Sequence, residues 1–91
     1  MYQKQVTVVN PTGLHARPAS DFVTLAKTFS SKIMIRDLNS DEPAVNAKSI
    51  VMLLSLGLAQ GAQAELSAEG EDAQRAVEEL AALISSGFGE V

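Results

Sequence analysis

The chain has 91 residues, of which 46% are hydrophobic and 20% charged, as expected for one small folded domain spanning residues 1–91. Its net charge of −4 argues against nucleic acid as the main partner and against an anionic membrane surface, because both bind basic proteins. With no cysteine and a single histidine, the chain cannot form a disulfide, a thiolate metal site or a multi-histidine metal site, and we expect no metal and no cofactor.

The first half of the chain predicts a strand, a helix and a second strand. Residues 2–9 alternate apolar and polar side chains, and the segment 10–13 that follows has the composition of a turn. Apolar residues then recur at helical spacing from Ala16 to about Thr28, with Pro18 in the first turn of the predicted helix. Residues 32–36 alternate again as a strand. The apolar positions expected to face the core are Tyr2, Val6, Val8, Ala19, Phe22, Val23, Ala26, Phe29, Ile33 and Ile35.

The next part of the chain predicts, in order, a loop, a short strand, a short helix and a further strand. Residues 38–43 form a polar loop, and residues 44–46 have the pattern of a short third strand. A short helix is predicted from Ser49 to about Leu54, stopped by Gly57, and residues 63–68 alternate as a fourth strand.

The last helix is predicted from Glu71 to about Ser85. Its first turn is expected to hold Glu71 and Asp72, where the helix dipole favours negative charge, and the tail of residues 87–91 is expected to fray. Because every strand alternates, the sheet should expose one face to water and pack helices on the other. The pattern therefore predicts an α+β fold with an antiparallel sheet, while the order of its strands does not follow from the pattern. The buried stripe of the last helix is expected to be Ala73, Val77, Leu80 and Ile84.

The segment from Gly13 to Pro18 holds the residues best suited to chemistry. His15 stands where a loop turns into a helix, and the unpaired N–H groups of a helix N-terminus, together with the dipole, form an anion site. Arg17 adds a planar, permanently charged group suited to phosphate. The same positive field disfavours imidazolium and leaves a neutral nitrogen able to act as a nucleophile. On these arguments alone, a solvated or capping histidine and a surface arginine remain the commoner alternatives to a phosphohistidine site.

The run Asn10–Ala19, which contains Gly-Leu-His-Ala-Arg-Pro, closely resembles the active-site signature of the HPr family of histidine-containing phosphocarriers. Residues 46–57 resemble the regulatory-serine region of that family, and residues 61–62 and 67–70 resemble the segment around its fourth strand. The resemblance implies an open-faced β-sandwich, in which a four-stranded antiparallel sheet carries three helices on one face in the order βαββαβα. It also implies a phosphocarrier of the bacterial sugar phosphotransferase system, whose partner enzymes complete the chemistry, and not an enzyme in the strict sense.

The same resemblance assigns roles to individual residues. His15 would be phosphorylated through Nδ1, the backbone N–H groups of Ala16 and Arg17 would bind the phosphoryl group, and the Arg17 side chain would steady it. Enzyme I, charged by phosphoenolpyruvate, would be the donor, and the EIIA domains of sugar permeases would be the acceptors. Ser49 would be phosphorylated by an HPr kinase/phosphorylase, with a catabolite-control transcription factor as a further partner. Ser49 also stands where a helix N-cap belongs, with Asn46 as a competing cap.

The five consecutive apolar residues 50–54 make the short helix apolar on all sides, which is more than a one-sided core can bury. Either a loop covers the excess, or part of this helix docks partners beside His15, a use to which methionine is suited. Lys27 and Lys48 are the remaining candidates for a basic rim around Arg17. The spacing from His15 to Ser49 is longer than in typical family members, and we place the extra length in residues 38–43. The candidate docking residues are Ile50, Val51, Met52, Leu54, Lys27 and Lys48.

Three other functions are weighed against this interpretation. A purely regulatory HPr-like protein is opposed by the presence of both His15 and Arg17. A carrier for a nitrogen-related chain or for a dihydroxyacetone kinase would show the same active-site motif. An acyl-carrier protein is opposed by the predicted strands and by the reversed order of Ser20-Asp21. Polar residues interrupt the first six positions, unlike a signal peptide, so we expect a cytoplasmic protein, and we expect a monomer.

Overall fold

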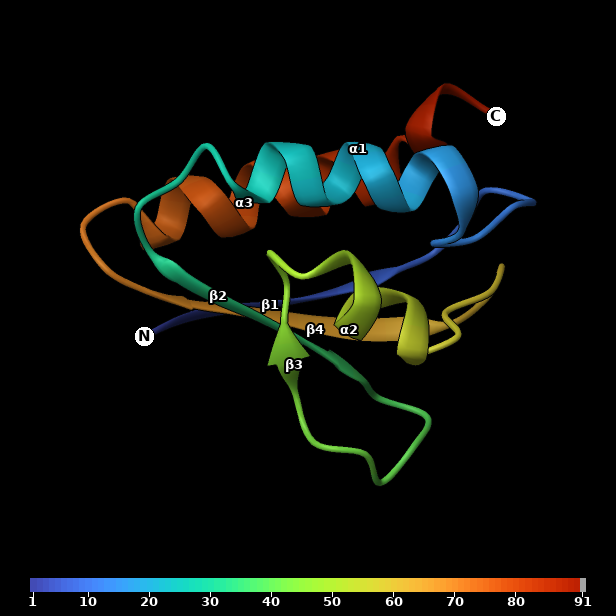
Figure 1. Ribbon diagram of the computed structural model, residues 1–91, viewed down its shortest axis with the longest axis horizontal. Coiled ribbons are helices and arrows are strands. Elements are labelled where there is room, and N and C mark those ends of the chain that lie inside the picture. Colours follow the sequence, from blue (N-terminus) through green and yellow to red (C-terminus); the bar gives the residue numbers. More distant parts are fainter. Residues whose placement is uncertain (91) are drawn as a thin grey trace.

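The elements of the chain follow the predicted order of strand, helix, strand, strand, helix, strand and helix. The computed structural model describes residues 1–90 (Figure 1). None of the helices in this range is long and apolar enough to cross a membrane. The elements are β1 (Tyr2–Thr7), α1 (Ala16–Ala26), β2 (Lys32–Asp37), β3 (Val45–Asn46), α2 (Ile50–Ser55), β4 (Gln63–Glu69) and α3 (Ala73–Ser85), with a 3-10 turn at Gly87–Gly89.

The four strands form one antiparallel sheet in the order β1-β4-β2-β3, so the first strand of the chain pairs with the last. In this register Val6 lies opposite Ala64, and Ile35 lies opposite Leu66. All these side chains are buried, which places them on the covered face of the sheet. Figure 1 shows α1 and α3 side by side across that face, and α2 between α1 and the loop that joins β2 to β3. The predicted open-faced sandwich, with its helices on one face, is confirmed.

The core forms where the covered face of the sheet meets the apolar stripes of α1 and α3. Small residues of β4, Ala64 and Ala68, lie beneath these helices and let them approach the sheet closely. Phe22 of α1 is fully buried, and truncating such a side chain to alanine costs about 3–5 kcal/mol. Of the predicted core positions, only Tyr2 remains partly exposed. Those that are buried include Val6, Val8, Ala19, Phe22, Val23, Ala26, Phe29, Ile33, Ile35, Ala73, Val77, Leu80 and Ile84.

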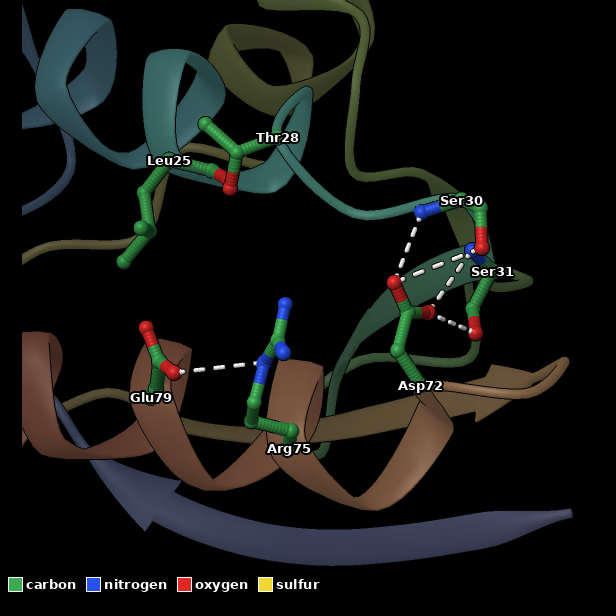
Figure 2. A network of polar contacts seen from close by, with 7 residues as sticks. All are labelled: Leu25, Thr28, Ser30, Ser31, Asp72, Arg75 and Glu79. Carbon is green, nitrogen blue, oxygen red and sulfur yellow. Dashed lines mark hydrogen bonds and ion pairs between the residues drawn. The ribbon is translucent and has the colours of Figure 1, made fainter.

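The prediction that Glu71 and Asp72 occupy the first turn of α3 is wrong. The helix begins at Ala73, Asp72 is the residue before it, and the first turn contains no acidic side chain. The Asp72 carboxylate does not cap its own helix but accepts hydrogen bonds from the backbone N–H groups of Ser30, at 2.9 Å, and Ser31, at 3.0 Å, and from the hydroxyl of Ser31 (Figure 2). These donors hold the pKa of Asp72 at about 2, with the Ser31 hydroxyl as the largest cause. Asp72 therefore fastens the start of α3 to the loop between α1 and β2.

The expectation that residues 87–91 fray is wrong for the part of the tail that the structure describes, and Val91 lies outside it. Phe88 packs against the core from a backbone with a φ of 54°. The Glu90 carboxylate accepts hydrogen bonds from the Asn10 side-chain amide at 3.0 Å and from the backbone N–H of Thr12 at 3.3 Å. Residues 87–90 therefore close over the loop that precedes α1.

Replacing Asp72 with asparagine tests the role of its carboxylate. Because the pKa of Asp72 is lowered on folding, its contribution to stability is present above its ordinary pKa of about 4 and is lost as the pH falls through about 2. We expect Asp72→Asn to lower the free energy of unfolding at neutral pH and to flatten its fall in this acid range, as measured by denaturant unfolding. The neighbouring exposed residue supplies the control, since Glu71→Gln should leave both unchanged. Equal pH profiles for Asp72→Asn and the wild type would contradict this role.

Candidate active site

The loop between β1 and α1 is held tightly against the loop between α2 and β4. The backbone N–H of Leu14 donates to the carbonyl of Leu58 at 2.8 Å, and the Leu14 side chain is fully buried. Gly13 has a φ of 71°, and a Cβ placed on it would lie 2.6 Å from the carbonyl oxygen of Leu58. Only glycine fits here, because any side chain would clash and the backbone lies in the left-handed region. This close contact fixes the position of the residue that follows, His15.

His15 is the N-cap residue of α1, with an extended backbone and no hydrogen bond from its side chain to the helix. The next residue, Ala16, has a φ of 51°, a left-handed conformation that costs a non-glycine residue about 1–3 kcal/mol. The abrupt turn places the half-buried His15 at the N-terminal end of α1. Its side chain is not used to cap the helix.

Two backbone donors follow His15 directly in the chain. Ala16 and Arg17 are the first two residues of α1, so their N–H groups have no intrahelical acceptor, and Pro18 has no N–H. Neither N–H group donates to another backbone carbonyl within residues 1–90. The Arg17 guanidinium is exposed and forms no ion pair with the described residues. The start of α1 thus combines an imidazole, two amides without a backbone acceptor and an exposed guanidinium, and such a set suits a phosphoryl group.

The C-terminal residues border this site, although the sequence pattern did not indicate it. Arg17 and Pro18 share a shallow hollow of about 300 Å³ with Asp21, Phe88 and Glu90. The hydrogen bond from Asn10 holds the pKa of the Glu90 carboxyl below its usual range. The only sequence signal for this arrangement is an apolar residue, Phe88, between two glycines in a segment that otherwise reads as a polar tail.

Ser49 is the N-cap of α2, as predicted, and its hydroxyl oxygen accepts a hydrogen bond from the backbone N–H of Met52 at 3.3 Å. The competing candidate, Asn46, accepts instead from the backbone N–H of Lys48 at 2.9 Å. The Ser49 side chain is half-buried, with its hydroxyl at the start of the helix.

The helix that follows Ser49 buries one side chain and exposes the rest. Leu53 is fully buried, whereas Val51 is 71% exposed. The other three apolar residues, Ile50, Met52 and Leu54, are each about 40% exposed (38%, 42% and 42%). No loop among the described residues buries them, so the alternative in which a loop covers these side chains is excluded.

The prediction that Lys27 and Lys48 form a basic rim around Arg17 is wrong. Lys27 is the C-cap of α1, ten residues beyond Arg17 along a helix that rises 1.5 Å per residue, which places it about 15 Å from Arg17. The Lys48 ammonium donates to the carbonyl of Phe29 at 2.7 Å, beyond the same end of α1. Free carbonyl groups after a helix end attract a cation, and this attraction draws Lys48 away from His15. Both lysines lie near the start of α2.

Comparison with known proteins places this chain among phosphocarriers. Residues 2–86 match the family described as "PTS HPr component phosphorylation site". The phosphocarrier protein HPr of Haemophilus influenzae is 48% identical over 84 residues, which cover 92% of this chain and 95% of that protein. The multiphosphoryl transfer protein of the same organism is 43% identical over 92% of this chain, which spans only 17% of that longer relative.

Solved structures agree with the sequence comparison. The crystal structure of HPr-C-His from Thermoanaerobacter tengcongensis superposes with a TM-score of 0.93 at 47% identity and covers 100% of this chain and 99% of that one. An HPr dimer from the same organism is 48% identical, with a TM-score of 0.76, covering 99% of this chain and 100% of that one.

Removing the Glu90 carboxylate should loosen the loop that precedes His15. We expect Glu90→Ala to speed amide hydrogen exchange at Thr12, because that N–H loses its acceptor, while the central strands stay protected. Asp21→Ala is the matched control, since Asp21 borders the same hollow but forms no hydrogen bond among the described residues. Unchanged exchange at Thr12 in the Glu90 variant would show that the contact does not persist in solution.

Proposed function

The chain belongs to the HPr family of phosphocarriers of the phosphotransferase system, and from this we propose that His15 accepts a phosphoryl group from phospho-Enzyme I and passes it to EIIA domains of sugar permeases. A phosphocarrier is not itself a catalytic enzyme, so the partner enzymes supply the remaining catalytic groups. We propose that residues 1–91 form a single carrier domain.

The observation that carries this proposal is the unused N-terminus of α1 beside His15. The imidazole makes no capping bond, and the free N–H groups of Ala16 and Arg17 point from the first turn of the helix. As the lone pair of Nδ1 forms a bond to phosphorus, the bond between phosphorus and the donor breaks, and charge spreads over the phosphoryl oxygens. The two amides and the Arg17 guanidinium stabilise that charge without any rearrangement of the backbone. Return of the phosphoryl group to an acceptor uses the same contacts in reverse.

Partner docking is proposed on the exposed side chains of α2. A large exposed apolar surface on a protein this small is typical of a binding site, and a flexible residue such as Met52 adapts to more than one partner. Lys27 and Lys48, which lie near the start of α2, form the charged edge of this surface in place of the rim first expected around Arg17. The proposed docking surface comprises Ile50, Val51, Met52, Leu54, Lys27 and Lys48.

Regulation at Ser49 is also proposed, with an HPr kinase/phosphorylase as the modifying enzyme and a catabolite-control transcription factor as a partner of the modified form. The Ser49 hydroxyl lies at the N-terminus of α2, where the helix dipole tolerates a phosphate. The added negative charge would meet an acidic partner at the edge of the docking surface, and such like-charge contacts are costly.

We also propose that the carrier acts in the cytoplasm as a monomer. Because a related HPr has been solved as a dimer, sedimentation of this chain over a range of concentrations is the measurement that decides its oligomeric state.

The carrier function is tested by incubation with Enzyme I and labelled phosphoenolpyruvate. We expect the wild type to gain one acid-labile phosphoryl group and His15→Ala to gain none. Arg17→Ala should transfer markedly more slowly yet change the free energy of unfolding by less than about 0.5 kcal/mol, because the side chain is exposed. Arg36→Ala is the control, since Arg36 pairs with Glu65 on β4 and should not affect transfer. Labelling of His15→Ala would overturn the proposal.

Two substitutions at Ser49 separate its capping role from its regulatory role. Ser49→Ala removes the cap and should cost about 1 kcal/mol of stability while leaving transfer to His15 unchanged. Ser49→Asp retains a cap but should slow phosphorylation by Enzyme I, most strongly at low salt, where repulsion is least screened. Ser67→Asp adds the same charge on β4, outside the docking surface, and should have no effect on the rate. If Ser49→Asp is phosphorylated as fast as the wild type at low salt, Ser49 acts as a cap only.

A further inference from the structure

A groove of about 560 Å³ separates α2 from the loop of residues 38–43. Successive helical residues are rotated by about 100°, so Ile50 and Leu54 lie on one side of the buried Leu53, and Met52 and Leu56 lie on the other. Met52 and Leu56 line the groove, whereas Ile50 and Leu54 do not. In Figure 1, α2 separates this loop from α1, and no residue of α1 lines the groove, which therefore lies on the side of α2 away from that helix.

The floor of this groove is apolar. Val45 and Leu56 pack against the core and are half-buried, and the more exposed Met52 and Pro43 continue the apolar surface toward solvent. A volume of this size lies within the range of sites that bind small molecules or side chains. The groove therefore has room for one or two apolar side chains of a partner.

The rim of the groove is acidic. Asp37 and Glu42 line it, and Asp41, next to Glu42, is exposed. No basic side chain lines the groove, because the nearest one in sequence, Arg36, extends to Glu65 at 3.5 Å. With these carboxylates left without cationic partners among the described residues, the groove attracts positive charge.

Hydrogen bonds hold the acidic loop in place before any partner arrives. The backbone N–H of Leu38 donates to the carbonyl of Gln63 at 2.9 Å, and the side-chain oxygen of Asn39 accepts from the N–H of Gln63 at 3.1 Å. Farther along, the Ser40 hydroxyl oxygen accepts from the N–H of Glu42 at 2.9 Å. Because the loop is anchored to β4 at its start and is bonded within itself farther along, little ordering is required on binding.

We propose that this groove docks a segment of a partner protein that inserts an apolar side chain above Val45 and Met52 and places a lysine or arginine against Asp37 and Glu42. The apolar floor disfavours a simple metal cation as the occupant, and the negative rim disfavours nucleic acid. The groove lies on the side of α2 away from α1, and Met52 is the one residue that it shares with the docking surface proposed for the exchange of phosphoryl groups.

The test uses the isotope-labelled chain and a synthetic hexapeptide of alternating leucine and lysine. We expect the peptide to shift the amide resonances of residues 37–42, 44–45 and 52–56, with an affinity that falls as salt is added. A hexapeptide of alternating leucine and glutamate should not bind. Resonance changes centred on another surface, no changes at all, or equal binding of the two peptides would each overturn the proposal.

Matched charge reversals complete the test. Glu42→Lys should weaken binding of the leucine–lysine peptide by at least about tenfold, because it sets like charges against each other. Glu71→Lys makes the same change of charge at an exposed position before α3 and should leave the affinity unchanged. Both variants should still accept a phosphoryl group at His15, which separates a failure of this proposal from a failure of the carrier function. If resonances of the groove move with protein concentration in the absence of peptide, a second copy of the chain is the occupant and the proposal is wrong.

Discussion

The contact between Gly13 and the backbone of Leu58 and Ala59 is the constraint on which the candidate site depends. With no side chain between them, the two loops meet closely enough for Leu14 to bond to Leu58 and to fill the core. The chain must then rise directly into α1, and it does so through a left-handed Ala16. The left-handed backbone of Ala16 and the uncapped start of α1 thus both follow from the close contact between these two loops. Core packing thus holds a backbone conformation at the candidate site that is locally unfavourable.

The short helix α2 shows how a small domain carries exposed apolar surface without losing its fold. Leu53 is the one buried side chain of the helix, Leu56 at its C-cap packs against the core, and the Ser49 hydroxyl caps its first turn. Every other apolar residue of the helix is exposed to solvent, and these residues point in different directions around the helix axis. A helix held at so few points can present different side chains in different directions, which gives one element more than one surface for contact.

Much of the fold could be predicted from the sequence, because hydrophobic periodicity reports which face of each element is buried. The alternation of Ile33 and Ile35 and the stripe through Phe22 led directly to the correct elements. The errors share one cause, a polar side chain with a partner distant in the sequence. Asp72 bonds to Ser31 across 41 positions and Glu90 to Asn10 across 80, and no local rule anticipates either pair. Lys48 was misplaced for the same reason, since a carbonyl 19 positions away holds its ammonium. His15 and Arg17 could be proposed from the sequence because a continuous motif contains them.

The pairing of β1 with β4 has a consequence for how the chain reaches its native state. β1 lies at one edge of the sheet and has β4 as its only neighbour among the strands. Because β1 precedes β4 in the sequence, it must wait during synthesis for residues 63–69 before it can complete its hydrogen bonds. Contacts between segments that are distant in the sequence raise the contact order and slow folding, because a large loop must close before they form. Until β4 pairs with β1, the side chains of Val6 and Val8, which are buried in the folded domain, stay exposed to solvent. The unfolded chain is therefore most open to aggregation before β4 is in place.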